Sequence, residues 1–229
     1  MPNSILTIFL KSEGMTQRHD ILLVCKREFG PALCDFIAQL HPKARANFAS
    51  SRAAVETALD EAGGAPVRLI TFLTDIIIPE ALLIRAGLTG YNIHPGPPTY
   101  PGVAPTTFAI WDEATTFGVT AHELAPRVDE GAIVAVNTFP MPLGVSEYDL
   151  GDHAFAAALT LFRDIARHCA SSASPLPRSG ERWSGIKRTY RDLDRLKARF
   201  SSLSAGDRAR LLRACADVVP TVTSRNRAA

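Results

Sequence analysis

The sequence predicts an α/β fold: a Rossmann-like, open and mostly parallel sheet with helices on both of its faces. Residues 68–73 form a nearly continuous apolar run, which is typical of a parallel strand that is covered on both faces. Residues 79–86 follow with a short helical pattern that begins at a proline and ends at Gly87. A second strand then leads to His94, so strand, helix and strand make one crossover unit of such a sheet.

Strand-like and helix-like patterns alternate along the rest of the chain. The helix that begins at Gly30 has its apolar residues at helical spacing, which indicates one face turned to a core. Ser146-Glu147-Tyr148-Asp149 is a capping-box signature that introduces a long amphipathic helix. The predicted core positions of these two helices are Leu33, Phe36, Ile37, Leu40, Phe155, Leu159, Phe162 and Ile165. Further strands are predicted over residues 4–10, 21–25, 119–124 and 132–139, and further helices over residues 53–62 and 103–112.

Length and composition are those of a soluble enzyme. The chain has 229 residues, 46% of them hydrophobic, which is enough for one large domain with a substantial core. No apolar run approaches the roughly 18 residues of a membrane span. Residues 4–10 are apolar but too few, and they lack the basic leader and cleavage site of a signal peptide. We therefore expect a cytoplasmic protein with no membrane partner.

Cysteines and histidines are scattered, so the sequence predicts neither a metal site nor a disulfide framework. Cys25, Cys34, Cys169 and Cys215 are widely spaced and form no paired ligand pattern, which fits a reducing compartment. The six histidines include no His-x-x-x-His pair of the kind that binds zinc. A glycine-rich nucleotide-binding loop is also missing from the sequence.

Composition divides the chain into a main domain over residues 1–170, a linker or surface loop over 171–180, and a basic, mainly helical extension over 181–229. From Arg178 onward the sequence has 13 Lys and Arg against 5 Asp and Glu, a net charge of +8. Such a surplus suits an anionic partner, although basic solvated helices are the more common explanation. The last helix is predicted to dock on the body or on another subunit through Leu211, Leu212, Cys215 and Val218.

The most informative stretch is Tyr91-Asn92-Ile93-His94-Pro95. Asn92 and His94 are two residues apart, so on an extended strand their side chains leave the same face. Pro95 offers no N–H to a neighbouring strand and disfavours helix at His94, so the strand should end there. Open α/β sheets bind ligands at such strand ends. Asp129, in Val128-Asp129-Glu130-Gly131, is the third polar residue that could serve the same site.

These motifs together resemble the folate-dependent formyltransferases, the family that includes glycinamide ribonucleotide, methionyl-tRNA and sugar-nucleotide formyltransferases. The match is strongest over residues 69–140 and faint before Val67. The distance along the chain between His94 and Asp129 is also similar to that in the family. The motifs that carry the resemblance are Asn-x-His-Pro at 92–95, Tyr-Pro-Gly at 100–102, Gly-Val-Thr at 118–120 and Val-Asp-x-Gly-x-Ile at 128–133.

Other segments bear on the branch of the family and on the acceptor. Trp183 and residues 187–193 look like the sugar-modifying branch. No further domain of about a hundred residues follows the catalytic one, which argues against initiator tRNA and makes nucleic acid an unlikely partner. Residues 11–19, where relatives have a glycine-rich turn that helps to seat the acceptor, contain Gly14 as their only glycine. The expected partner is a small-molecule amine, with phosphorylated or nucleotide-linked amines as candidates.

The resemblance implies 10-formyltetrahydrofolate as the formyl donor. In relatives, the pterin enters a pocket walled by the loop after the strand that precedes the histidine motif. An apolar loop can also be plain core, but this one lies one crossover away from His94, which favours the pocket. The residues assigned to the donor site are Asp75, Ile76, Ile77, Ile78, Pro95 and Gly131.

The three polar side chains suit formyl transfer between nitrogens. The reaction passes through a tetrahedral centre with a negative oxygen, to which the amide of Asn92 could donate a hydrogen bond. Imidazole titrates close to neutrality, so His94 could act as acid or base. Asp129 could favour the imidazolium form or relay a proton through a water. Neither a metal nor a covalent nucleophile is needed.

Each residue alone also has a structural explanation. Asn92 could cap a turn, and His94 could be a hydrogen-bonded residue at a strand end. Asp129 could belong to an ordinary hairpin turn. The order and spacing of the three together favour the catalytic interpretation. His122, in the strand-like segment 118–124, is interpreted as structural.

The predicted activity is transfer of a formyl group from 10-formyltetrahydrofolate to a primary amine, with an amino-sugar nucleotide as one candidate acceptor. Two alternatives stay open. The first is a formyltetrahydrofolate hydrolase that uses Asn92, His94 and Asp129 with water as the acceptor. The second is a non-catalytic folate-binding module. A homodimer is one option for the assembly.

Overall fold

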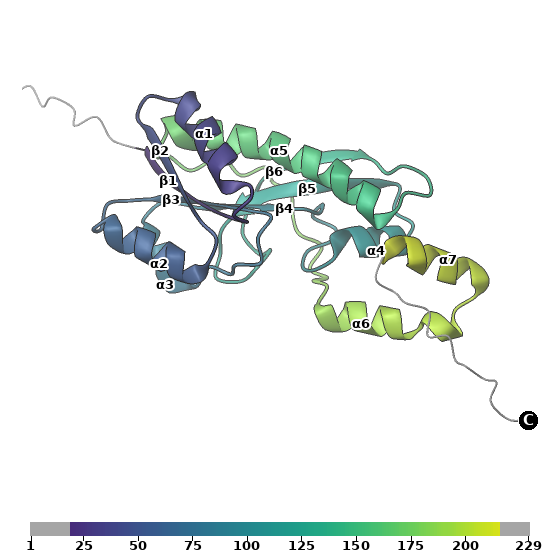
Figure 1. Cartoon of the computed structure of the whole chain (residues 1–229). Helices are drawn as coiled ribbons and strands as arrows, with labels where there is room; N and C mark the ends of the chain where they lie inside the picture. Colours follow the sequence, from purple (N-terminus) through teal and green to yellow (C-terminus); the bar gives the residue numbers. More distant parts are fainter. Residues whose placement is uncertain (1–18, 216–229) are drawn as a thin grey trace, which may run out of the picture.

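The computed structural model describes residues 19–215 and has a six-stranded sheet between two layers of helices (Figure 1). The order of the strands in the sheet is β2-β1-β3-β4-β5-β6. Their bounds are β1 (His19–Cys25), β2 (Ala44–Ala49), β3 (Arg68–Phe72), β4 (Tyr91–His94), β5 (Thr116–Glu123) and β6 (Ile133–Pro140).

Parallel pairing dominates the sheet. β1 pairs in parallel with both β2 and β3, and β3 pairs in parallel with β4. The pairs β4–β5 and β5–β6 are antiparallel. The predicted α/β class with an open, mostly parallel sheet is therefore confirmed. The antiparallel side matters for the site, because β5 runs back along β4 and sets His122 opposite Asn92.

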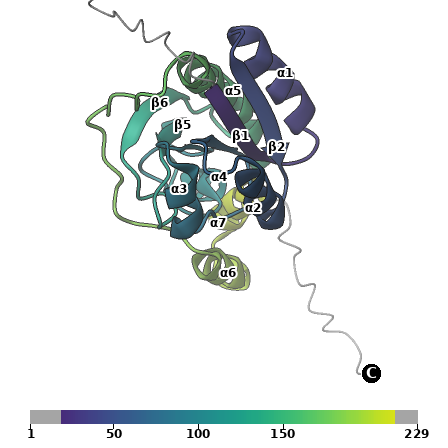
Figure 2. The same ribbon diagram turned by 90° about the vertical axis from the view of Figure 1, so that its left-hand side faces the viewer.

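Helices cover both faces of the sheet, as predicted (Figure 2). α1 (Gly30–Leu40) and α5 (Glu147–Ser171) pack on one face, and α2 (Arg52–Glu61) and α3 (Glu80–Ala86) pack on the other. Each face has its own cluster of buried hydrophobic side chains. The completely buried strand β3 separates the two clusters, which explains its nearly continuous apolar sequence.

Most of the predicted elements are present with ends shifted by about three residues or fewer. The sequence analysis did not predict β2. This outermost strand of the described sheet has the sequence Ala-Arg-Ala-Asn-Phe-Ala, which lacks the β-branched residues that strands favour. The strand predicted over residues 4–10 lies outside the described residues, as does nearly all of the turn discussed at residues 11–19.

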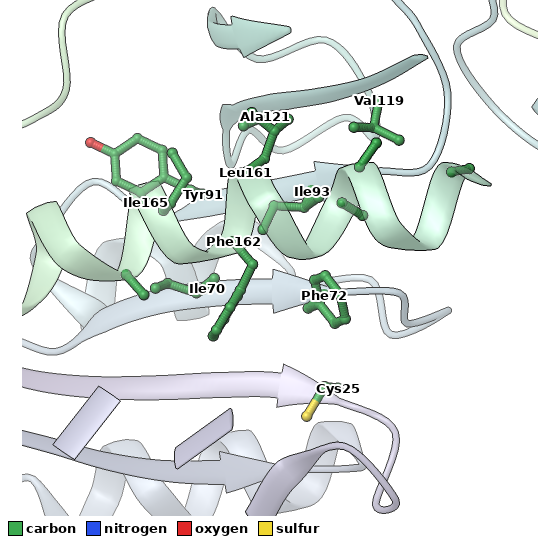
Figure 3. Close-up of a cluster of buried hydrophobic side chains, with 14 of the residues drawn as sticks. Cys25, Ile70, Phe72, Tyr91, Ile93, Val119, Ala121, Leu161, Phe162 and Ile165 are labelled. Carbon is green, nitrogen blue, oxygen red and sulfur yellow. The ribbon is translucent and has the colours of Figure 1, made fainter. Parts of the chain in front are cut away.

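Aromatic packing under α5 forms the centre of the larger core (Figure 3). Phe162 is fully buried, and its ring centroid lies 5.4 Å from that of Phe72 on β3. We expect Phe162→Ala to lower the free energy of unfolding by about 3–5 kcal/mol, because the lost side chain leaves a cavity between helix and sheet. Urea denaturation would measure the change. Tyr148→Ala on the same helix is the control, since Tyr148 is 76% exposed and should change stability by about 0.5 kcal/mol or less.

The C-terminal helices form a third group with α4 (Pro105–Trp111). α6 (Tyr190–Ala198) and α7 (Ala205–Ala214) are helical as predicted and share a small apolar core with Phe108 of α4. Leu211 and Cys215 are buried there, as predicted for docking on the body, whereas Leu212 is exposed and does not pack against the body. Consecutive helical residues point about 100° apart, and Leu211 takes the inward direction. Val218 lies outside the described residues.

Residues 172–189, which we call the strap, connect α5 with α6 across the edge of the sheet. Buried side chains anchor its first part: a guanidinium nitrogen of Arg68 donates to the Ala173 carbonyl at 2.6 Å. The Leu176 N–H donates to the Tyr91 hydroxyl at 2.7 Å. Further along, the Ser179 N–H donates to the Ile133 carbonyl of β6 at 2.9 Å. Among residues 19–215, no helix combines the length and the hydropathy needed to cross a lipid bilayer.

Candidate active site

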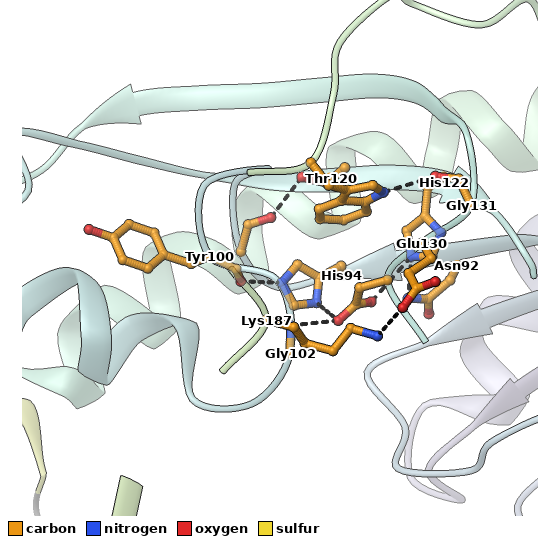
Figure 4. A network of polar contacts seen from close by, with 12 residues as sticks. Asn92, His94, Tyr100, Gly102, Thr120, His122, Glu130, Gly131 and Lys187 are labelled. Atoms are coloured by element: carbon orange, nitrogen blue, oxygen red, sulfur yellow. Dashed lines mark hydrogen bonds and ion pairs between the residues drawn. The ribbon is translucent and has the colours of Figure 1, made fainter. Parts of the chain in front are cut away.

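Polar side chains converge at the carboxyl end of β4 (Figure 4). Asn92 and His94 both line one cavity, as their spacing on a strand predicts. The neighbouring strands place Thr71 and His122 in register with Asn92. Asp129, from the connection between β5 and β6, reaches the same point and contacts both histidines. The structure thus brings Asn92, His94 and Asp129 together.

His94 lies between two hydrogen-bond acceptors. Its Nε2 is 2.9 Å from the Tyr100 carbonyl oxygen, and its Nδ1 is 3.4 Å from Oδ2 of Asp129. A carbonyl can only accept, so Nε2 carries a hydrogen and Nδ1 is the atom at which a proton is gained or lost. Only 4% of the residue is exposed. Burial lowers the pKa of His94 and outweighs the opposing charge of Asp129, so the ring is neutral at neutral pH.

Asp129 is a buried carboxylate with one unsatisfied oxygen. Oδ2 accepts a hydrogen bond from the Gly102 N–H at 2.8 Å, whereas Oδ1 has no hydrogen-bond partner among the described residues. Burial alone would raise the pKa of Asp129, but the adjacent His122 and His94 and the Gly102 N–H lower it. Its backbone has φ +52°, a conformation that costs energy for a residue with a side chain. A charged acceptor is therefore held in a strained turn beside His94.

Asn92 is oriented by a chain of hydrogen bonds. His122 Nδ1 lies 2.8 Å from the Glu123 carbonyl and donates to it, while Nε2 faces the Asn92 amide, whose nitrogen can only donate. The Asn92 amide nitrogen, 2.9 Å away, donates to that Nε2, and the Thr71 hydroxyl donates to the Asn92 amide oxygen at 2.5 Å. The amide nitrogen has two hydrogens, which leaves one for a ligand in the cavity.

His122 belongs to this cluster, although the sequence analysis interpreted it as structural. The residue is 2% exposed, and its Nε2 lies 3.4 Å from Oδ1 of Asp129. Alternation along β5 could show only that His122 shares a face with neighbouring strand residues. The antiparallel register with β4, which decides that this face meets Asn92, is a long-range feature.

The cavity beside these residues has a volume of about 750 Å³, which is within the range of small-molecule sites. Its walls include most of the residues that the sequence assigned to the donor site. Ile77 and Val128 line it and are 62% and 44% exposed, which is unusual for hydrophobic side chains and suits an apolar ligand surface. The predicted donor-site residues that line the cavity are Asp75, Ile76, Ile77, Ile78 and Pro95.

Gly131, the remaining residue of that prediction, does not line the cavity. A Cβ atom at this position would overlap the Glu123 carbonyl oxygen, so glycine permits close packing of the turn against β5. The Gly131 carbonyl accepts a hydrogen bond from Nε1 of Trp183 in the strap at 2.9 Å. Its place next to Asp129 is thus explained by packing within the described structure.

Basic side chains stand around the cavity. Lys26, from the turn after β1, Arg127, Lys187 and Arg188 all line it. Lys187 forms an ion pair with Glu130 at 2.9 Å, and Arg188 lies 3.6 Å from Asp112. These cations come from three separate parts of the chain. Within residues 19–215, no group of three or more His, Cys, Asp or Glu side chains is placed to hold a metal ion.

Comparison with known proteins agrees with this geometry. The family model described as formyl transferase matches residues 29–155. An N-formyltransferase from Helicobacter canadensis, solved with folinic acid and dTDP-3-aminofucose, superposes with a TM-score of 0.63 at 15% identity, covering 85% of this chain and 80% of that one. A sugar N-formyltransferase from a Shewanella species gives a TM-score of 0.65 at 17% identity, covering 86% and 88%.

A third similar structure is HypX from Aquifex aeolicus in complex with tetrahydrofolic acid. Its TM-score is 0.55 at 18% identity, and the match covers 86% of this chain but 34% of that one. At such identities the similarity shows a shared fold, while the family model covers more than half of the chain. The chain belongs to the formyl transferase family. The resemblance found in the sequence motifs is thereby confirmed, as is the prediction of a formyltransferase-type enzyme.

Proposed function

We propose that this protein transfers a formyl group from 10-formyltetrahydrofolate to the primary amine of a nucleotide-linked amino sugar, with Asn92, His94 and Asp129 as its catalytic residues. The observation that carries the proposal is the buried carboxylate of Asp129: its Oδ2 lies 3.4 Å from Nδ1 of His94, and its Oδ1 has no hydrogen-bond partner within residues 19–215. A buried acceptor of this kind is costly unless a ligand donates to it. An attacking amine supplies such a donor.

The donor half of the cavity suits a folate. A pterin is flat with apolar faces, and Ile76, Ile78 and Val128 offer apolar walls to it. The proteins from Helicobacter canadensis and Aquifex aeolicus were solved with folinic acid and tetrahydrofolic acid, which supports the same ligand class here. Bound in this half, the carrier supplies the formyl group next to the end of β4.

Asn92 stabilises the negative oxygen of the transition state in this mechanism. One amide hydrogen is committed to His122, and the second can be donated to the oxygen of the formyl group as charge develops there. Because Thr71 holds the other end of the amide, the donor is oriented before the reaction begins. Such preorganised donors are effective since no further reorientation is needed at the moment of reaction.

His94 acts as the base. Its free Nδ1 accepts a proton as the amine attacks, and the carboxylate of Asp129, 3.4 Å away, stabilises the imidazolium that forms. The Tyr100 carbonyl keeps the hydrogen on Nε2 throughout, so the proton is directed to Nδ1. The same proton can then be delivered to the nitrogen that leaves.

A nucleotide-linked amine suits the basic rim. Lys26 and Arg127 line the cavity, and the ion-paired Lys187 and Arg188 add positive charge beside it. Tyr190, 66% exposed on the same wall, offers an aromatic face. These groups match a pyrophosphate and a base, and the Helicobacter canadensis protein was solved with dTDP-3-aminofucose.

The test is product analysis on a panel of amines. The purified chain is incubated with 10-formyltetrahydrofolate and dTDP- or UDP-linked amino sugars, and mass spectrometry follows the gain of one formyl group on the amine. Free amino sugars and hydroxyl analogues of the same nucleotides are the controls. We expect formylation of at least one nucleotide-linked amino sugar and of none of the controls. Donor loss at the same rate without any amine would favour the hydrolase, and neither product nor donor loss would favour a binding module.

A further inference from the structure

The strap lies outside residues 29–155, the part of the chain that matches the family model, and it packs against the loop that follows β4. Backbone hydrogen bonds join it to the loop that follows β4: Ser184 N–H to Pro98 carbonyl at 3.0 Å and Arg188 N–H to Pro101 carbonyl at 2.9 Å. The Val103 N–H returns a bond to the Arg188 carbonyl at 3.1 Å. This loop also contains Tyr100, whose carbonyl holds Nε2 of His94.

The strap carries Trp183 onto the active-site cluster. The centroid of the indole lies 5.7 Å from the ring of His94 and 5.1 Å from the ring of His122, with interplanar angles of 78° and 84°. These edge-to-face contacts are a favoured geometry for aromatic rings. The indole Nε1 also donates to the Gly131 carbonyl at 2.9 Å. One side chain therefore contacts both histidines and the turn that presents Asp129.

Trp183 stands between the cluster and the solvent. It is half-buried, whereas His94 and His122 are 4% and 2% exposed, and it is not among the residues that line the cavity. A ligand in the cavity would meet His94 and Asp129 from the other side. Trp183 is thus placed to act through its neighbours and not on the substrate itself.

We propose that Trp183 is a positioning residue of this active site. It holds the rings of His94 and His122 in place, anchors the turn that contains Asp129, and excludes water from the cluster on the side of the strap. The strained Asp129 turn is tied to Gly102 through the carboxylate and to Trp183 through the Gly131 carbonyl. Losing one tie lets the turn relax. The catalytic consequence rests on the proposed function, whereas the contacts themselves do not.

The first experiment measures kcat and the pH dependence of kcat/KM for Trp183→Ala and Trp183→Phe. We expect Trp183→Ala to lower kcat by about 10- to 100-fold, because small displacements of reacting groups are costly. The acid limb of the pH profile of kcat/KM should move to higher pH in this variant. Water that reaches His94 relieves the burial that lowers the pKa of His94, while Asp129 and His122 remain in place. Trp183→Phe keeps an aromatic ring at this position. Its kcat should fall by about tenfold or less, and the acid limb of its pH profile should stay at the wild-type position.

Trp111→Phe is the matched control, because Trp111 is the only other tryptophan and stacks on Arg210 in the C-terminal group. It should leave both kcat and the limb unchanged. A lower kcat for Trp183→Ala with an acid limb at the wild-type position would mean that the residue only supports folding, and the proposal would be wrong.

A second experiment needs neither donor nor acceptor, so it stands apart from the proposed function. In the Trp111→Phe background, Trp183 is the single tryptophan, so tryptophan emission reports on the side chains that its indole contacts. We expect His94→Gln and His122→Gln each to change its quantum yield. His153→Gln on α5 should not. Unchanged emission in both cluster variants would show that the contacts are not made and would overturn the proposal.

Discussion

His94→Ala is expected to lower kcat for formyl transfer by about two to four orders of magnitude, with donor binding nearly intact. The variant removes the group whose Nδ1 we propose as the acceptor of the amine proton, and it leaves the carboxylate of Asp129, 3.4 Å from that nitrogen, without its imidazole partner. Asn92 and His122 keep their mutual hydrogen bond, so the oxyanion donor should stay in place. The residual rate then reports what positioning and Asn92 achieve alone.

The measurement pairs turnover with a direct assay of donor binding, such as fluorescence titration with a formyl-folate. His153→Ala is the matched control, since His153 lies on α5 and its ring bonds to a carbonyl of its own helix. Wild-type turnover in His94→Ala would remove His94 from the mechanism. Loss of turnover together with loss of donor binding would instead assign it a structural role.

Asp129→Asn has the second-largest expected effect, a loss of about 100-fold or more in kcat/KM. The amide keeps the size of the side chain but removes the charge that, in the proposed mechanism, stabilises the imidazolium of His94. Asp129 also raises the pKa of His94, against the larger lowering by burial. Without that charge the pKa falls further, so the acid limb of kcat/KM should move to lower pH while the plateau drops.

The pH dependence of stability gives a second readout for Asp129. Its pKa is lowered in the folded protein, so its stabilising contribution is present above the unfolded value of about 3.9 and is lost as pH falls through the folded pKa. Asp129→Asn should remove this part of the acid sensitivity. Asp164→Asn, at an exposed ion pair on α5, is the control. If the acid limb of kcat/KM in Asp129→Asn stays at the wild-type position, the proposed electrostatic coupling between Asp129 and His94 is wrong.

Local patterns predicted the central part of the fold. β3 is buried on both faces and mostly apolar, and α3 begins after Pro79 and ends before Gly87, which has φ +73°. Both signals lie within a few residues of the element that they predict. β2 carried no such signal, because its pairing with β1 supplies what its own residues lack.

The residues of the candidate site also divide into those that local patterns predict and those that only long-range contacts bring to the site. Asn92 and His94 were predicted because strand periodicity and Pro95 act over neighbouring residues. Neither His122 nor Trp183 was assigned to the site by the sequence analysis. Their contacts cross long stretches of chain: β5 must return antiparallel beside β4, and the strap must cross back to the loop after β4.

Short stretches of the sequence were enough to predict the α/β class, the crossover unit that ends at His94, and the family motifs that contain Asn92, His94 and Asp129. Hydrophobic periodicity, proline and glycine are local constraints, so they can be interpreted along the chain. Three features became visible only in the folded chain: His122 orients Asn92, Gly131 serves packing, and Trp183 contacts both histidines. Register and loop docking depend on the burial of distant surfaces together, which no single segment encodes.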